Sequence, residues 1–181
     1  MMKWMVVGDI HGSISAANKI KEVLSNKEIK GCLLLGDILY HGPRNPILEE
    51  YNPKAVVDIL NSMKEKVIAV RGNCDSEVDQ MVLAFPMMSD MNQLFLQDKK
   101  VILTHGHLEG DYSTILEKGD ILIQGHTHIL KAEKVGDYYL LNAGSLSLPK
   151  ENNPRTYGIL SDKEFVVLDI EDNEIQKILW D

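Results

Sequence analysis

The sequence predicts an α/β (α+β) fold, a four-layer αββα sandwich in which two mixed β-sheets pack face to face between outer helices. Three observations support it. Short apolar runs alternate with amphipathic segments in the first half of the 181 residues, which is typical of βαβ units and a mainly parallel sheet. The second half changes to a β-rich run with turn signals. No repeat, low-complexity tract or flexible linker divides the chain, so we expect one domain over residues 1–181.

In the first half, the expected elements alternate between strand and helix. The apolar runs predict strands at residues 4–7, 33–35 and 67–70. Helices are expected after Ser13 or Ser15, after Asn52 with Pro53, and over residues 77–83 following the Ser76 and Asp79 pair. The first two helices carry apolar side chains at one-face spacing, namely Ala17, Ile20 and Leu24, and Val56, Leu60 and Met63.

The second half predicts strands only. Residues 94–96 and 101–103 are expected to form an antiparallel hairpin, and residues 121–123 a further buried strand. Five more strands are expected at residues 131–135, 138–141, 156–160, 165–170 and 175–179. Turn residues at Gly136-Asp137 and Asp172-Asn173 separate two pairs of these strands.

Charge and cysteine content limit the class of partner and the compartment. Nineteen Lys and Arg against 27 Asp and Glu give a net charge of -8, which is the wrong sign for gripping a long nucleic acid through its phosphates. Cys32 and Cys74 show no paired spacing, and no apolar run approaches the length needed to cross a bilayer. We therefore expect a cytoplasmic protein that binds neither a membrane nor a long nucleic acid.

Polar clusters follow five of the expected strands, at the point where each strand ends. They are Gly8-Asp9-Ile10-His11-Gly12, Gly36-Asp37, Gly72-Asn73-Cys74-Asp75, Thr104-His105-Gly106-His107 and Gly125-His126-Thr127-His128. Because the carboxyl ends of strands converge on the ligand-binding edge of α/β sheets, residues far apart in the sequence can meet there. We expect the five clusters to form one site.

The residue types in these clusters favour a metal site. Imidazole, carboxylate and amide oxygens suit Mn²⁺, Fe, Co²⁺, Ni²⁺ or Zn²⁺ better than a closed structural zinc site. The ligands are too many for one tetrahedral ion, and they suit two ions that share a bridging carboxylate, about 3.5 to 4 Å apart. Such a centre is locally cationic and attracts phosphate despite the acidic composition.

The ordered set of motifs resembles the calcineurin-like metallophosphoesterases from Asp9 to about Pro149. The motifs are Asp-x-His, Gly-Asp, Gly-Asn-x-Asp, Thr-His-Gly-His and Gly-His-Thr-His. Within that superfamily, residues 39–45 and 70–79 are most similar to the YfcE-like bacterial phosphodiesterases. The resemblance implies the metallophosphoesterase fold and hydrolysis of a small phosphodiester, or of a phosphomonoester, with Mn²⁺ as the expected metal.

The resemblance also implies a role for each ligand. Asp9, His11 and His128 hold one metal, Asn73, His105 and His126 hold the other, and Asp37 bridges the two. A hydroxide that bridges the ions is then the nucleophile that attacks phosphorus, because bound metals lower the pKa of water.

Cys74 departs from the pattern of many family members, which have a histidine at this position that is thought to assist the leaving group or bind the phosphate. A thiol is mostly neutral at pH 7 and donates only weak hydrogen bonds. The candidate catalytic residues are Cys74 itself and its possible substitutes His107, His41 and Arg44, with Arg44 as a phosphate-binding fork. His41 is equally compatible with a structural role in its loop, and Arg44 with a solvated loop arginine.

Two other functions were weighed against the hydrolase. A noncatalytic scaffold is the main alternative, because the small subunit of the retromer coat resembles this fold but has lost part of the metal set. A protein serine/threonine phosphatase is disfavoured by the short chain and by Tyr40-His41-Gly42, where that family has Asp-Arg-Gly. The natural substrate, the physiological metal and the oligomeric state stay open, and a homo-oligomer is compatible with the sequence.

Overall fold

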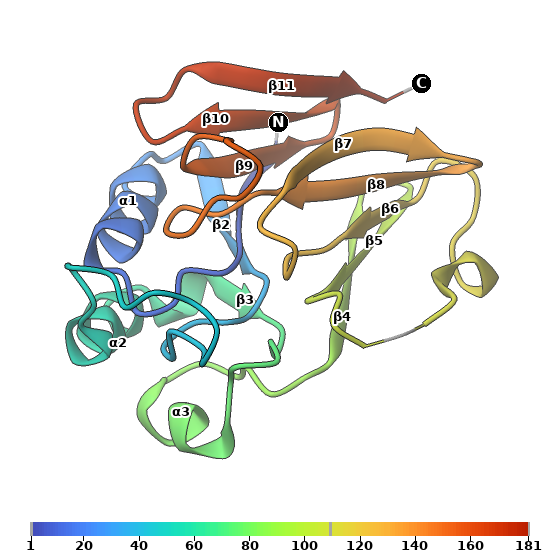
Figure 1. Cartoon of the computed structure of the whole chain (residues 1–181). Coiled ribbons are helices and arrows are strands. Elements are labelled where there is room, and N and C mark those ends of the chain that lie inside the picture. The colour runs from blue at the N-terminus through green and yellow to red at the C-terminus, as the bar shows by residue number, and fades with distance from the viewer. Residues whose placement is uncertain (1, 109, 181) are drawn as a thin grey trace.

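Two β-sheets stacked face to face organise the chain in a computed structural model that describes residues 2–108 and 110–180 (Figure 1). The strand order is β11-β10-β9-β1-β2-β3 in the first sheet and β4-β5-β6-β8-β7 in the second. Both sheets contain parallel and antiparallel pairs. The predicted sandwich of two mixed sheets is confirmed.

The first sheet joins strands from both ends of the chain. Its members are β1 (Lys3–Val7), β2 (Ile29–Leu34), β3 (Val67–Ala69), β9 (Thr156–Ser161), β10 (Glu164–Asp169) and β11 (Glu174–Leu179). Strands β1, β2 and β3 are parallel, as expected. β9 pairs antiparallel with β1, and β10 and β11 follow as hairpins, so half of this sheet is antiparallel. The prediction of a mainly parallel sheet holds only for the first three strands.

The second sheet is built from the middle of the chain. Its members are β4 (Met91–Leu96), β5 (Lys99–Thr104), β6 (Ile121–Ile123), β7 (Leu130–Val135) and β8 (Tyr138–Ala143). β4 and β5 form the predicted hairpin. β6 lies parallel to both β5 and β8, with Ile123 opposite Leu103 and Leu141. The carboxyl ends of β5 and β6 therefore point the same way.

Three α-helices form where caps and apolar spacing predicted them: α1 (Ile14–Leu24), α2 (Pro53–Asn61) and α3 (Glu77–Val82). Ser13, not Ser15, caps α1, because its Oγ accepts the Ala16 N–H at 3.1 Å. Short 3₁₀ helices at Lys64–Lys66 and Tyr112–Thr114 were not predicted. Between residues 2 and 180, no described helix is long and apolar enough to cross a membrane.

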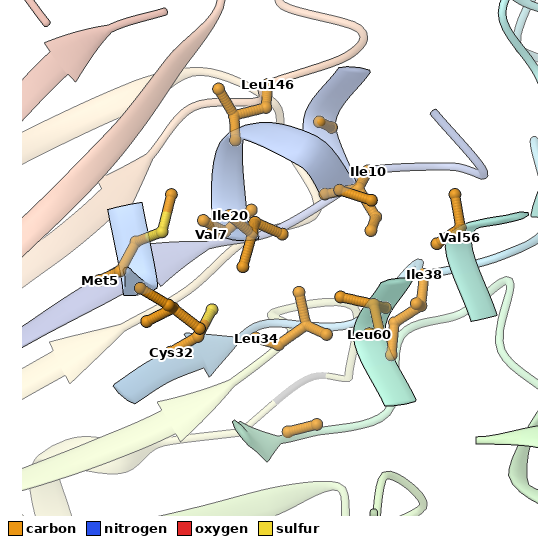
Figure 2. Close-up of a cluster of buried hydrophobic side chains, with 14 of the residues drawn as sticks. Met5, Val7, Ile10, Ile20, Cys32, Leu34, Ile38, Val56, Leu60 and Leu146 are labelled. Carbon is orange, nitrogen blue, oxygen red and sulfur yellow. The ribbon is translucent and has the colours of Figure 1, made fainter. Parts of the chain in front are cut away.

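The apolar core lies in two layers on either side of the first sheet. Met5 and Val7 of β1 face α1 and α2, where they pack in a cluster with Ile20, Leu34 and Leu60 (Figure 2). Val6, between them, points to the opposite face and packs in the cluster between the two sheets, because side chains alternate along a strand. Cys32 is buried in the first cluster, as expected. These two layers fix the strands whose ends carry the site.

Candidate metal centre

The seven predicted ligands occupy the turns that leave five strands. Asp9 and His11 follow β1, Asp37 follows β2, Asn73 follows β3, His105 follows β5, and His126 and His128 follow β6. Five of them have positive φ although none is glycine: Asp9 (57°), His11 (46°), Asp37 (52°), His126 (66°) and His128 (60°). Such a left-handed backbone is uncommon outside glycine and is held in place where the surrounding structure enforces it, typically at functional sites.

Asp9, His11 and His128 form the first group of buried polar side chains. Nε2 of His128 lies 3.3 Å from Oδ1 of Asp9 and 3.3 Å from Nε2 of His11. All three side chains offer their ligand atoms within 4.8 Å of one another. This group matches the three residues predicted to hold the first metal.

Asp37 and His105 extend the cluster towards the remaining predicted ligands. Oδ2 of Asp37 lies 3.6 Å from Nε2 of His11, and Oδ1 lies 3.5 Å from Nε2 of His105. Oδ1 of Asn73 is 3.1 Å from the same His105 nitrogen, and the ring centroid of His126 is 5.1 Å from that of His105. All seven predicted ligands therefore lie in one cluster, with Asp37 between its two halves.

The three buried histidines share one ring orientation. The Nδ1 atoms of His11, His105 and His128 lie 2.8, 2.6 and 2.7 Å from the carbonyl oxygens of Tyr40, Leu35 and Leu148, respectively. Because a carbonyl oxygen only accepts hydrogen bonds, each Nδ1 carries the proton. In the neutral rings the lone pair on Nε2 then points into the cluster, which is how histidine is held when it binds a metal.

The converging atoms are almost all acceptors. With His128 neutral, Oδ1 of Asp9 is buried without a hydrogen-bond donor among the described residues. It faces the Nε2 lone pairs of His128 at 3.3 Å and His105 at 3.9 Å. Lone pairs and carboxylates packed in this way repel one another unless a cation lies among them. The side chains present therefore fit divalent metal ions.

Protonation of His128 competes with metal at this centre. Burial disfavours the charged form of His128 most strongly, but the Asp9 carboxylate outweighs it and raises the pKa of His128 above its ordinary value. For His11 the balance is reversed, since burial outweighs the Tyr40 carbonyl and the two aspartates and lowers the pKa. Of these two histidines, His128 is therefore the one whose protonation competes more strongly with metal binding.

We expect the metal affinity of the protein to fall as the pH is lowered. Because His128 must lose its proton to bind, and its pKa is raised, Mn²⁺ affinity should fall about tenfold per pH unit below that pKa. Calorimetric titration of metal-free protein with Mn²⁺ between about pH 8 and about pH 6 measures this dependence. An affinity that stays constant across the range contradicts the competition.

Two buried serines hold the backbone of Asp9. The hydroxyls of Ser145 and Ser147 both donate to the Asp9 carbonyl oxygen, at 2.8 and 2.6 Å. The backbone N–H of His126 donates to Oδ2 of the Asp9 side chain at 2.9 Å. Asn142 donates to the Gly125 carbonyl at 2.8 Å and so fixes the turn that carries His126. Asp9 is therefore oriented by the loop after β8 as well as by its own turn.

Asp75 holds the turn that carries Asp37. Its carboxylate accepts the backbone N–H groups of Asp37, Ile38 and Gly72 at 2.8, 2.8 and 2.7 Å. Burial raises the pKa of Asp75 to about 6, although these hydrogen bonds oppose the rise. Through these hydrogen bonds Asp75 supports the turn that positions a metal ligand.

An open groove of about 770 Å³ adjoins the cluster. Its lining includes ligands from both halves, Asp37, Asn73, His126 and His128, together with Cys74, Tyr40, Arg44 and Lys150. Cys74 and Arg44, two of the four predicted catalytic residues, thus face the same space as the metal ligands. The volume is in the range of small-molecule sites.

Cys74 is a neutral thiol in this groove. Burial, followed by the negative charge of Asp37, raises the pKa of Cys74 to about 12. Its backbone N–H donates to Oδ1 of Asp37 at 2.8 Å, and its Sγ accepts from the Asn73 amide at 3.2 Å. Cys74, His11 and Asp37 also form a further group whose ligand atoms lie within 4.8 Å.

The other two predicted catalytic residues have different surroundings. The His107 ring lies 5.2 Å from that of His105 and 6.2 Å from that of His126, beside a separate cavity of about 480 Å³. Burial and the two neighbouring histidines lower the pKa of His107. The His41 ring packs edge-on against Tyr40 and Tyr51, at 4.6 and 5.3 Å, and does not line the groove. These contacts are those of a loop residue.

Sequence reasoning missed the groups that orient the ligands. The carbonyls of Leu35, Tyr40 and Leu148 carry no signal in the sequence, because every residue has such a group. Ser145 and Ser147 could have been found as polar residues directly after the strand that ends at Ala143, as the metal ligands follow theirs.

Comparison with protein families and curated proteins supports the predicted resemblance. Residues 2–164 match a family model described as the calcineurin-like phosphoesterase superfamily domain. "Phosphodiesterase YfcE" of Escherichia coli strain K12 is 44% identical over 176 residues, which cover 97% of this chain and 96% of the relative. "Probable metallophosphoesterase YsnB" of Bacillus subtilis is 27% identical, over 88% of this chain and 84% of the relative.

Solved structures share the fold. The YfcE phosphoesterase from E. coli superposes with a TM-score of 0.93 at 41% identity, covering 99% of this chain and all of the other. Wild-type Vps29 from Entamoeba histolytica, solved with Zn²⁺, gives a TM-score of 0.63 at 22% identity over 98% of this chain and 99% of the other. The second similarity is one of fold alone.

Proposed function

The chain belongs to the calcineurin-like phosphoesterase superfamily and is an enzyme of its phosphodiesterase class, and from this premise we propose that it hydrolyses small phosphodiesters at a centre of two divalent metal ions. The observation that carries the proposal is the inward-facing set of acceptor side chains around Asp9 and Asp37, beside an open groove. Mn²⁺ is the proposed working metal, and phosphomonoesters are the second substrate class.

The proposed ligand sets follow the two halves of the cluster. Asp9, His11 and His128 hold one ion, Asn73, His105 and His126 hold the other, and Asp37 contributes one oxygen to each side, which its 3.6 and 3.5 Å separations from His11 and His105 support. When bound, the two ions neutralise charge on the phosphoryl oxygens and lower the pKa of a water molecule for attack on phosphorus.

The remaining candidate residues have different roles in this proposal. His107 is mostly neutral at pH 7 because its pKa is lowered, so its ring N–H is available to donate a hydrogen bond to a phosphoryl or leaving-group oxygen. Cys74 lines the groove as a neutral thiol and does not act as a nucleophile. Arg44 binds an anion at the mouth of the groove. His41 keeps its loop in place through Tyr40 and Tyr51.

The rival function is a noncatalytic scaffold, and the similarity to the Vps29 structures, at 22% identity, is one of fold alone. Metal binding alone does not separate the two functions, since a Vps29 has been solved with Zn²⁺. The 44% identity to a phosphodiesterase over nearly the whole of both chains supports the enzyme.

Three further expectations stay proposals. We propose that residues 1–181 form one domain, with the two core layers sharing β1. Cytoplasmic localisation rests on the two free cysteines. A homo-oligomer fits the exposed apolar stripe of Val78, Met81 and Val82 on α3, where a second copy can pack.

The proposal is tested by removing and restoring metal. The protein is stripped with a chelator, Mn²⁺ is added back, and hydrolysis of bis-p-nitrophenyl phosphate is followed beside the His126→Ala variant. We expect no turnover without metal, turnover after Mn²⁺ is restored, and a large loss in the variant, which lacks one proposed ligand. A Mn²⁺-loaded wild-type protein with no turnover on any diester or monoester contradicts the enzyme.

Replacement of Cys74 by histidine should widen the range of leaving groups. A histidine donates a hydrogen bond far better than a neutral thiol, so the Cys74→His variant should gain activity on esters with poor leaving groups, such as phenyl phosphate, relative to p-nitrophenyl esters. Steady-state kinetics on diesters and monoesters of both alcohols measure the ratio. A ratio that does not change refutes the role given to this position.

A further inference from the structure

Two basic side chains stand at the mouth of the groove and have no partner there. Arg44 and Lys150 are both exposed and line the groove together with the ligands His126 and His128. Across residues 2–108 and 110–180, neither side chain forms an ion pair or donates a hydrogen bond. Unpaired cations beside a ligand cluster are unexpected in a chain whose net charge is -8.

Both residues are anchored next to predicted metal ligands. The Lys150 N–H donates to the carbonyl oxygen of His128 at 3.3 Å. Arg44 belongs to a loop that packs on the cluster through Gly42, where a Cβ would lie 3.1 Å from Sγ of Cys74 and 4.0 Å from Cε1 of His11. The two cations therefore reach the groove from segments that are far apart in the sequence.

The acidic groups of the groove do not balance these charges. Asp37 and Asp75 are the acidic residues among the described residues that line it. The Asp37 side chain is only 4% exposed and points into the ligand cluster, and the Asp75 carboxylate is occupied by three backbone N–H groups. Arg44 and Lys150 are thus free to meet an anion that enters from solvent.

A simple phosphodiester makes use of the ligand cluster but not of the two basic side chains of the groove. It carries one negative charge, on the reacting phosphate, and the proposed function places that phosphate at the buried ligands. Arg44 and Lys150 lie at the mouth, where the ester group that is not cleaved at once extends towards solvent. A negative charge on that ester group can pair with the arginine fork and the lysine ammonium, which are groups that bind carboxylates and phosphates in proteins.

We propose that Arg44 and Lys150 form a subsite for a second anionic group, so that the preferred substrates are phosphodiesters whose retained ester group carries a further negative charge. This inference rests on the proposed function for the position of the reacting phosphate. The metal centre alone does not distinguish a charged retained ester group from a neutral one.

A matched pair of substrates tests the subsite. The two substrates are phosphodiesters that join p-nitrophenol to either 4-carboxyphenol or 4-carbamoylphenol. They share the p-nitrophenolate leaving group and the same shape, and differ by one negative charge on the retained ring. We expect the Mn²⁺-loaded protein to show a KM about tenfold lower for the carboxylate at low salt, with most of this preference lost at high salt. Each of Arg44→Gln and Lys150→Gln should reduce the KM ratio by about threefold, and the double variant should bring it close to one.

A second readout does not depend on turnover. Calorimetry compares binding of the phosphonates 4-carboxyphenylphosphonate and 4-carbamoylphenylphosphonate, which have no ester bond to cleave, to the Mn²⁺-loaded wild type and variants, and the same loss of preference is expected. Lys64→Gln is the control, because Lys64 is exposed and lies before β3, at the end of the strand away from the site. This control should leave both ratios unchanged.

The outcomes separate the subsite from the proposed function. If wild type cleaves both diesters with the same KM, or if the ratio survives in the double variant, the subsite is wrong and the phosphodiesterase stands. If wild type cleaves neither diester, the phosphodiesterase is wrong, and the calorimetric ratio then decides the subsite on its own.

Discussion

Replacing Asp37 by asparagine should lower kcat/KM for diester hydrolysis by more than about 100-fold while leaving the fold intact. Asp37 is the carboxylate between the two halves of the cluster, and even residues that only orient metal ligands contribute about 10- to 100-fold. Asparagine has the same shape but no charge, and its amide donates to the lone pairs of His11 or His105. The metal-free variant should therefore be at least as stable as the metal-free wild type.

Thermal unfolding and kinetics measure both halves of this prediction. Wild type should gain stability on adding Mn²⁺, because a ligand that binds only the folded state raises the unfolding temperature, and Asp37→Asn should gain much less. Asp58→Asn, an exposed aspartate of α2, is the matched control and should behave as wild type. Retention of full activity in Asp37→Asn removes Asp37 from the centre.

Replacing Gly72 by alanine should damage the centre without removing any ligand. A Cβ on Gly72 would lie 2.1 Å from Oδ1 of Asp37 and 2.3 Å from its backbone nitrogen, so the turn after β2 must move. Because Gly72 does not have a positive φ, the cost of adding a Cβ comes from these close contacts and not from backbone strain. We expect a loss of about 1 to 3 kcal/mol in the free energy of unfolding, and a drop in Mn²⁺ affinity of more than tenfold.

Gly110→Ala is the control for this substitution. It also lacks a positive φ, and the three atoms nearest its added Cβ would all belong to the Tyr112 side chain, at 3.3 to 3.4 Å, far longer than the contacts at Gly72. Calorimetry and denaturant unfolding should show little change in the control. A Gly72→Ala protein that binds Mn²⁺ as tightly as wild type would mean that Asp37 and Gly72 are not in contact.

Local patterns were sufficient to predict most strands and helices, because the apolar spacing and the capping residues lie close together in the sequence. The strand predicted at residues 121–123 has the same bounds in the structure, and the Ser76 and Asp79 capping box is present. The placement of β9 beside β1 could not be predicted, since a strand's own residues do not indicate its distant partner. For the same reason, the antiparallel half of the first sheet could not be predicted.

The composition of the site was predictable, and the support of its ligands was not. Two aspartates, four histidines and one asparagine directly after apolar strands marked all seven side chains that the structure brings together. The orientation of His11, His105 and His128 depends on backbone carbonyls of residues far away in the chain, and the positive φ of Asp9 and Asp37 runs against their local preference. Tertiary contacts impose both features.

The most direct test of the account is the number of metal ions that the active protein holds. Metal-free protein is titrated with Mn²⁺, bound metal is counted by mass spectrometry after gel filtration, and hydrolysis of bis-p-nitrophenyl phosphate is measured at each step. The account predicts two ions per chain, with full activity only when both are bound. Full activity with a single ion per chain, or with none, would contradict it.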